Sequence, residues 1–220
     1  MKTEITITAL VCPRCGAGLD GLRWDCLFTC APCGLALFVE HGRTRLFPCT
    51  RARVDEGAPI GAGMLWLPFW ELATEVGVVE PPGSAPSLAG AAAALDRVWV
   101  AGFAVRRPEL FGEPGFLLTE QRARLEPAGE GGAPARMWGA CRGPELVTLY
   151  ARLTVMRLLD RRADVTGVEI DVRVTRADLW AVPFDDRGDR LVDLATGASL
   201  PAAAFEDLAE IRAAAERRPG

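Results

Sequence analysis

Four cysteines near the start of the chain have the residue type and spacing of a metal site. They lie in two Cys-x-x-Cys-Gly sequences, hereafter knuckles, with fourteen residues between Cys15 and Cys30: Cys12-Pro13-Arg14-Cys15-Gly16 and Cys30-Ala31-Pro32-Cys33-Gly34. A two-residue gap lets both sulfurs of a pair reach one ion, and the following glycine permits the positive φ that such a turn often requires. Four thiolates suit a tetrahedral Zn²⁺ at sulfur distances of about 2.3 Å. We therefore predict a structural zinc site whose ligands are Cys12, Cys15, Cys30 and Cys33.

The same four thiolates leave other interpretations open at this stage. An iron centre of the rubredoxin type uses an identical ligand set. A redox-active dithiol is less favoured, because thioredoxin-type pairs occur singly beside a βαβ pattern. With four protein ligands the metal is coordinatively closed and offers no position for water, so we expect no catalysis at the metal.

On the two knuckles, residues 8–50 resemble the zinc-ribbon family. The resemblance implies a small β module, and the local pattern predicts strands at 6–11 and 22–29, followed by a hairpin of 35–39 with 44–47. A core this small needs its metal to fold. Further on, the stretch Leu67-Pro68-Phe69-Trp70 is similar to one in uncharacterised bacterial proteins with an N-terminal ribbon. That similarity implies a bacterial protein and carries no activity with it.

Composition excludes several kinds of enzyme. The chain has 220 residues, half of them hydrophobic, and a formal net charge of −4, so it can bury a core. Lys2 is its single lysine, which rules out a Walker A loop and a lysine Schiff base in the body of the chain. His41 is its single histidine, which removes multi-histidine catalytic zinc sites such as H-E-x-x-H.

The distribution of apolar residues and cysteines predicts a cytoplasmic protein. Residues 1–8 alternate polar and apolar side chains, unlike a signal peptide, which needs an uninterrupted apolar segment. The longest apolar stretch, Met64 to Trp70, contains Pro68 and is too short to span a bilayer, so we expect no membrane span. Seven cysteines in a chain without an export signal favour a reducing compartment, where thiols bind metal.

The fold class that we predict is α+β, with the small β ribbon followed by a mainly antiparallel body and a C-terminal helix. Two domains are expected, a zinc ribbon over 1–50 and an α+β body over 51–220, joined by the polar, glycine-rich residues 51–63. The body's predicted strands are 65–79, 97–105, 168–174, 179–184 and 190–194. Its predicted helices are 88–95 with Ser87 as cap, a turn at 108–111, a long helix from Pro144 to Asp160, and 201–217. Loops are predicted at about 80–87 and 127–134.

Three cysteines and the histidine lie outside the predicted ligand set. Cys26 and Cys49 are expected to be packed thiols, although replacement of a knuckle ligand by Cys26 stays open. Cys141 lies in Gly139-Ala140-Cys141-Arg142-Gly143, which matches most of the caspase sequence Q-A-C-[RQG]-G. No apolar strand precedes it, and His41 is about a hundred residues upstream instead of about fifty, so we do not expect a catalytic cysteine.

Carboxylates gather in the last quarter of the chain: Glu169, Asp171, Asp178, Asp185, Asp186, Asp189 and Asp193. The run 185–189 loosely suggests an oxygen-rich cation loop. It lacks the glycine and terminal glutamate positions of an EF-hand, so a solvated hairpin turn is expected. We predict no catalytic residues and no organic cofactor.

Nucleic-acid binding is a second hypothesis, because many ribbons bind DNA or RNA. Residues 1–50 carry five basic and four acidic side chains, and four thiolates on one Zn²⁺ would add about two negative charges. A phosphate-binding face needs clustered cations, so nucleic acid is a disfavoured partner.

The closed metal site and the missing catalytic sets favour a non-enzymatic protein. Trp66, Trp99 and Trp180 each begin a short segment broken by Pro or Gly, and tryptophan is favoured at interfaces. We therefore predict a protein-interaction or assembly subunit whose partner is another protein, a multi-subunit assembly or a second copy. The alternative is a regulatory protein that binds nucleic acid through its ribbon.

Overall fold

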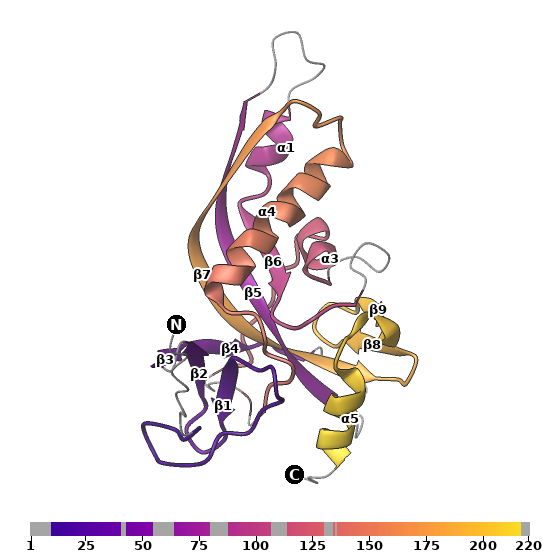
Figure 1. Cartoon of the computed structure of the whole chain (residues 1–220). Coiled ribbons are helices and arrows are strands. Elements are labelled where there is room, and N and C mark those ends of the chain that lie inside the picture. The colour runs from indigo at the N-terminus through magenta and orange to yellow at the C-terminus, as the bar shows by residue number, and fades with distance from the viewer. Residues whose placement is uncertain are drawn as a thin grey trace, which may run out of the picture.

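Two long antiparallel strands, β5 (Met64–Val79) and β7 (Glu169–Asp186), run the length of the molecule and carry the other elements (Figure 1). The structure is a computed structural model, and it describes residues 10–40, 43–54, 64–79, 88–106, 114–129, 134 and 136–216. β7 joins into one strand the two segments predicted at 168–174 and 179–184. A register shift between Ala73 and Thr74 marks a bulge in β5.

The larger sheet is mainly antiparallel, as predicted. Its order is β6 (Arg97–Ala101), β5, β7, β8 (Arg190–Asp193) and β9 (Ser199–Pro201). The short strand β4 (Cys49–Arg51) also pairs with β7, and this pairing is parallel. The α+β class is confirmed, together with the hairpin of β7 and β8.

A separate three-stranded antiparallel sheet carries the cysteine knuckles. Its strands are β1 (Leu27–Cys30), β2 (Leu35–Glu40) and β3 (Arg43–Phe47), in that order. The predicted hairpin of residues 35–39 with 44–47 is confirmed by the register of β2 against β3. The strand predicted at 6–11 lies mostly outside the described residues, and Val11 forms an isolated bridge with Gly18. We call residues 10–47 the N-terminal module.

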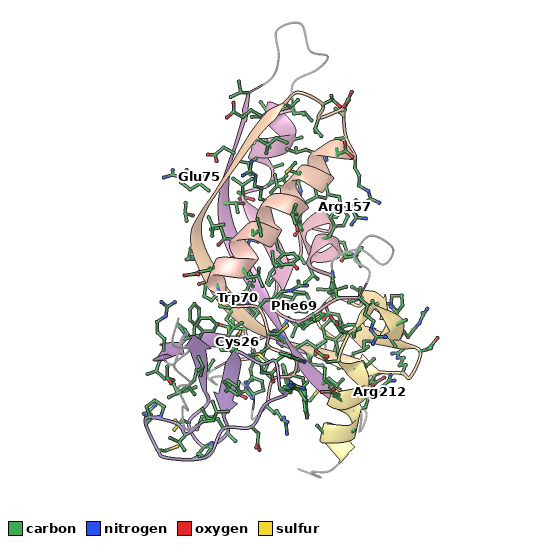
Figure 2. The ribbon with its side chains drawn as sticks, viewed as in Figure 1. Cys26, Phe69, Trp70, Glu75, Arg157 and Arg212 are labelled. Carbon is green, nitrogen blue, oxygen red and sulfur yellow. The ribbon has the colours of Figure 1, made fainter. Side chains whose placement is uncertain are left out.

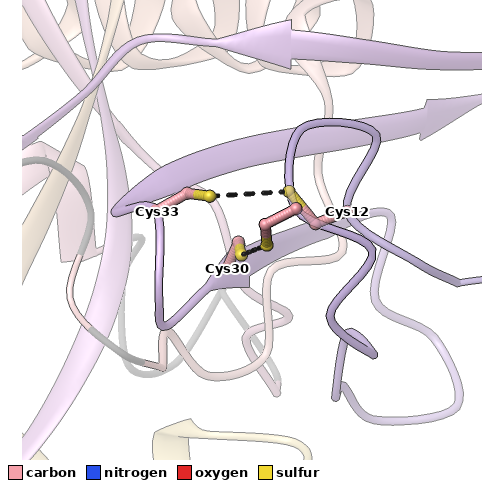
Figure 3. A group of neighbouring side chains, drawn as sticks. Cys12, Cys30 and Cys33 are labelled. Atoms are coloured by element: carbon pink, nitrogen blue, oxygen red, sulfur yellow. Dashed lines mark hydrogen bonds between the residues drawn. The ribbon is translucent and has the colours of Figure 1, made fainter.

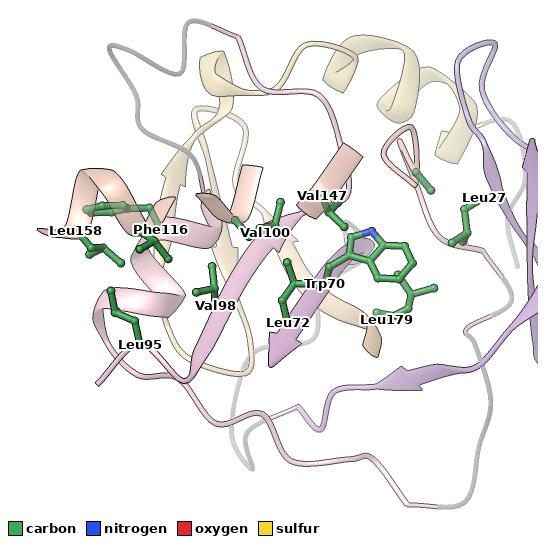
Figure 4. Packing of buried hydrophobic residues seen from close by; sticks show 14 of the residues in the cluster. Leu27, Trp70, Leu72, Leu95, Val98, Val100, Phe116, Val147, Leu158 and Leu179 are labelled. Atoms are coloured by element: carbon green, nitrogen blue, oxygen red, sulfur yellow. The ribbon is translucent and has the colours of Figure 1, made fainter. Parts of the chain in front are cut away.

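Both faces of the larger sheet are covered, which explains why its central strands are apolar on successive residues. Phe69 and Trp70, labelled in Figure 2, are neighbours on β5, so their side chains lie on opposite faces of the sheet, and they belong to different hydrophobic clusters. The hydrophobic cluster on the Trp70 side of the sheet includes side chains of α1 (Ala89–Ala93), α4 (Pro144–Asp160) and α3 (Pro114–Glu120). Figure 4 shows Val147 and Leu158 of α4 and Phe116 of α3 in this cluster. The 3₁₀ turn η1 (Ala202–Ala204) and α5 (Leu208–Glu216) cover the Phe69 face.

The N-terminal module packs directly on the larger sheet. Leu27, Ala36 and Phe38 belong to the same hydrophobic cluster as Trp70. The ring of Phe47 meets that of Trp70 edge-on, with 5.0 Å between centroids. The two predicted domains therefore share a core, and β4, which spans the predicted boundary at residue 50, pairs with β7 in the larger sheet. The division into two domains stays a prediction.

The secondary structure differs in detail from what the sequence predicted. The helix predicted over 201–217 begins at Leu208, because Phe205 is extended and pairs with Val105. The strand predicted over 97–105 ends at Ala101, where Gly102 donates a hydrogen bond to the carbonyl of Pro68. The helix α3 was not predicted. In α1 the N-cap is Leu88, and Ser87, the turn at 108–111 and most of both predicted loops lie outside the described residues.

Across the described part of the chain, no helix is both long and apolar enough to cross a membrane.

Candidate metal centre

The two knuckles fold in the same way. In each, the N–H of the glycine donates a 2.8 Å hydrogen bond to the carbonyl of the first cysteine, Gly16 to Cys12 and Gly34 to Cys30. Both glycines have positive φ, 73° and 60°, which confirms the reason for glycine at these positions. The turn directs both sulfurs of a pair to the same side of the chain.

The four predicted ligands are brought together. The sulfur atoms of Cys12, Cys15, Cys30 and Cys33 all lie within 4.8 Å of one another. Across the knuckles, the distance is 4.0 Å from Cys12 Sγ to Cys33 Sγ and 3.5 Å from Cys15 Sγ to Cys30 Sγ (Figure 3). Sulfurs placed about 2.3 Å from a tetrahedral ion would be about 3.8 Å apart, within this range. The cluster could therefore hold one metal ion.

Without a metal, the thiols in this cluster interact strongly with one another. The neighbouring Cys15 sulfur and burial raise the pKa of Cys33 to about 12, and burial raises the pKa of Cys30. Burial would also raise the pKa of Cys12, but hydrogen bonds from the backbone N–H groups of Arg14 and Cys15 lower it to about 7. Full deprotonation of the cluster near neutral pH therefore needs the charge of a bound cation.

A small apolar core supports the site. Leu19, Phe28 and Leu37 are buried in one cluster with Cys12 and Cys30. Cys15 is the exposed member of the ligand set. With so few apolar side chains, we expect the stability of the N-terminal module to depend on a bound metal ion and on its contact with the larger sheet.

The other three cysteines lie outside this cluster. Cys26 donates a hydrogen bond through its sulfur to the carbonyl of Ala140, at 3.3 Å. Cys49 lies on β4, where burial raises the pKa of its thiol to about 12. Burial likewise raises the pKa of Cys141 to about 11, so this thiol is a weak nucleophile at neutral pH. His41 lies outside the described residues.

The carboxylates of the Asp-rich hairpin are engaged by arginines and backbone groups. Asp186 receives two hydrogen bonds of 2.7 Å from Arg212 and one from the N–H of Gly188. Asp185 pairs with Arg187 at 2.9 Å. Asp193 is 1% exposed and accepts hydrogen bonds from the N–H of Ala195 and the hydroxyl of Thr196. The turn that was expected to be solvated is therefore part of a hairpin that is linked to α5 through the Asp186–Arg212 pair.

Sequence reasoning missed a groove between the N-terminal module and α4. It has a volume of about 440 Å³ and is lined by the residue before β1, by β2, by the segment before α4, and by α4 itself: Cys26, Phe38, Val39, Cys141, Gly143, Glu145, Leu146 and Leu149. Gly143 leaves room for the ring of Phe38, which would have to move if a Cβ were present at residue 143. The apolar residues on the outer face of α4 signalled this surface in the sequence.

Asp25 makes the stability of the N-terminal module depend on pH. Its carboxylate accepts a 2.7 Å hydrogen bond from the N–H of Leu22, but burial raises its pKa to about 6. The folded state therefore binds this proton more tightly than the unfolded state, and ionisation costs up to about 3 kcal/mol once the pH exceeds 6. We expect Asp25→Asn to raise the free energy of unfolding above about pH 6 and to have little effect below about pH 4.

Denaturant unfolding of the Asp25→Asn variant and the parent across this pH range tests the prediction. Both proteins carry the same four cysteines. Any pH dependence that comes from these thiols is therefore the same in both and cancels in the difference between their free energies of unfolding. The exposed Asp171 gives the matched control, Asp171→Asn, for which we expect no such pH-dependent gain. A gain for Asp25→Asn that is the same at every pH would contradict the prediction.

The fold and the site together define a cluster of four cysteines, able to hold one metal ion, in a module with a three-stranded antiparallel sheet that packs on a larger α+β sheet. Searches against protein-family models, curated proteins and solved structures gave no match to this chain.

Proposed function

We propose that this chain is a non-enzymatic zinc-ribbon protein that docks a partner protein, with Zn²⁺ in a structural role. The sulfur distances and the closed four-thiolate set support a structural zinc ion. The raised pKa of Cys141 and the ion pairs of Asp185 and Asp186 support the absence of an activity at those residues.

The observation that carries the docking proposal is an exposed apolar stripe on α4. Its side chains are 39–57% exposed and follow one another at intervals of three, four and three residues: Leu146, Leu149, Leu153 and Met156. The opposite face of the helix is buried on the sheet through Val147, Ala151 and Val155. A helix with apolar residues on both faces leaves one face for a partner.

The spacing and the charges of α4 indicate the kind of partner. Intervals of three and four residues form the seam that a second helix packs against. The stripe continues into the groove beside the N-terminal module through Leu146 and Leu149. Residues 144–162 carry four arginines and two acidic side chains, in a chain whose formal net charge is −4. We therefore propose an amphipathic helix with acidic flanking residues as the partner segment.

A matched pair of variants tests the docking proposal. We expect Leu149→Ser/Leu153→Ser to stay folded, because both side chains are exposed, and to weaken a one-to-one complex with a purified partner at least about tenfold. The control is Leu46→Ser on β3, which removes a leucine of similar exposure, 54%, from another surface. Affinities measured by titration calorimetry compare the three proteins.

Equal loss in the control and the double variant would contradict the use of this face. Light scattering after gel filtration reports whether the occupant is a second copy of the chain. A salt-dependent shift of DNA or RNA that Leu149→Ser/Leu153→Ser does not alter would favour the nucleic-acid hypothesis instead.

A further inference from the structure

A second cavity, distant in sequence from the cysteines, is lined by three arginines. It has a volume of about 260 Å³ and lies where α1 and α3 end beside the start of β6: its lining is Ala93, Ala94, Asp96, Arg97, Trp99, Thr119, Arg122 and Arg124. We call it the arginine cavity. Asp96 is its one acidic lining residue among those described.

Two of the three guanidinium groups have no partner among the described residues. Arg97 forms a 2.6 Å ion pair with Glu71, whose other oxygen accepts a hydrogen bond from Trp180 Nε1. For Arg122 and Arg124 the described part of the chain supplies no side-chain hydrogen bond, ion pair or ring contact. Among the described residues, Glu71 pairs with Arg97 and Asp96 is the one acidic lining residue, so three guanidinium groups face two carboxylates and the cavity keeps an excess of positive charge.

Arg122 occupies a backbone position that ordinarily belongs to glycine. Its φ is 52°, the one positive φ of a non-glycine residue in the described chain. It ends α3 in a Schellman motif, because its N–H bonds the carbonyl of Thr119 at 3.0 Å and the N–H of Ala123 bonds that of Leu118 at 2.8 Å. Glycine would adopt this conformation without strain, so folding alone does not favour arginine here.

The helix ends at this cavity do not oppose an anion strongly. Free carbonyls at the C-terminal end of a helix disfavour anions. In α3, the carbonyls of Leu118 and Thr119 already accept the two hydrogen bonds of the Schellman motif. In α1, the carbonyl of Ala92 accepts a hydrogen bond from the N–H of Leu95. Both helices are short. Arg122 and Arg124, which have no partner among the described residues, supply the positive charge that offsets these helix dipoles.

We propose that the arginine cavity binds a small phosphate-bearing ligand, with Arg122 and Arg124 as its principal contacts and Arg97 as a third cation. Guanidinium groups bind phosphate oxygens through paired N–H donors, which fits the residue type. The volume suits a phosphate group with a small substituent. This site is independent of the metal centre and of the docking face on α4.

Binding of inorganic phosphate to the full chain tests the proposal, measured by titration calorimetry at constant ionic strength with chloride as the reference anion. We expect saturable binding that falls about tenfold or more in Arg122→Gly, a loss typical of one charge-assisted contact. Because glycine relieves the backbone conformation, the ligand-free variant should melt at the same temperature as the parent or higher. If Arg122→Gly binds phosphate more weakly but is at least as stable as the parent, the loss of affinity comes from the missing contact with phosphate and not from impaired folding.

Arg124→Gln should weaken binding similarly, and Arg152→Gln, an exposed arginine on α4, is the control for general loss of charge. The proposal is overturned if the parent shows no saturable binding at millimolar phosphate, if Arg122→Gly/Arg124→Gln binds as the parent does, or if Arg152→Gln loses as much affinity as Arg122→Gly.

Discussion

A Cys30→Ser variant is expected to purify with almost no bound metal and to lose the folded N-terminal module. Serine offers no soft thiolate, and three ligands leave the ion open to water and exchange. Structural zinc supplies roughly 10–16 kcal/mol of folding free energy in zinc-finger peptides. The core around this site consists of few side chains, Leu19, Phe28 and Leu37 among them, and cannot replace that contribution.

The loss should reach the larger sheet as well. Leu27, Ala36 and Phe38 of the N-terminal module share a cluster with Trp70, and the N–H of Cys26 bonds the carbonyl of Ala140 at 2.8 Å. Unfolding of the module therefore uncovers part of the main core. We expect the melting temperature of the whole chain to fall by about 10 °C or more.

Metal content by mass spectrometry and thermal unfolding by circular dichroism measure both effects. Cys26→Ser is the matched control, because Cys26 lies outside the four-sulfur cluster and a serine hydroxyl can still donate to Ala140. We expect the control to keep one ion per chain. Zinc in the parent would support the assignment of a structural zinc ion. Visible absorption typical of iron would show instead that the four cysteines bind iron. Equal metal content in Cys30→Ser and the parent would contradict the predicted ligand set.

The metal centre could be predicted from the sequence because its determinants are local. Each knuckle needs two cysteines at a fixed interval and a glycine with positive φ, and all of these lie within five residues. An apolar run likewise predicted β5, and the alternation of apolar and polar residues predicted the first part of β7. Such features depend on the chain nearby, so a single sequence contains them in full.

The parts that could not be predicted depend on contacts between distant segments. β4 pairs with a strand about 130 residues away, and α5 starts late because Phe205 pairs with Val105. The arginine cavity combines residues 93–99 with residues 119–124. In α3, Pro114 suits the first turn of a helix but Gly115 disfavours helix locally, and the helix is stabilised by its packing against β6.

Gly115→Ala is expected to be among the most damaging single-methyl changes in this chain. A Cβ at residue 115 would lie 2.6 Å from the carbonyl carbon of Trp99 and 2.7 Å from Val100 Cα, with the Trp99 oxygen closer still. These are backbone atoms of β6 and cannot rotate away. α3 must therefore move off the strand, which breaks the 2.8 Å hydrogen bond from the N–H of Trp99 to the Thr119 hydroxyl. We expect a loss of about 3 kcal/mol or more in the free energy of unfolding.

Gly90→Ala in α1 isolates the effect of this close approach. The substitution is the same and also lies in a short helix, but a Cβ at residue 90 meets no atom within 4 Å. Helix propensity alone favours alanine there by up to about 1 kcal/mol, so this variant should be unchanged or more stable. Denaturant unfolding of the two variants compares them directly. If Gly115→Ala matched Gly90→Ala in stability, α3 would not be seated on β6 as described, and the position of Arg122 at the end of that helix would lose its support.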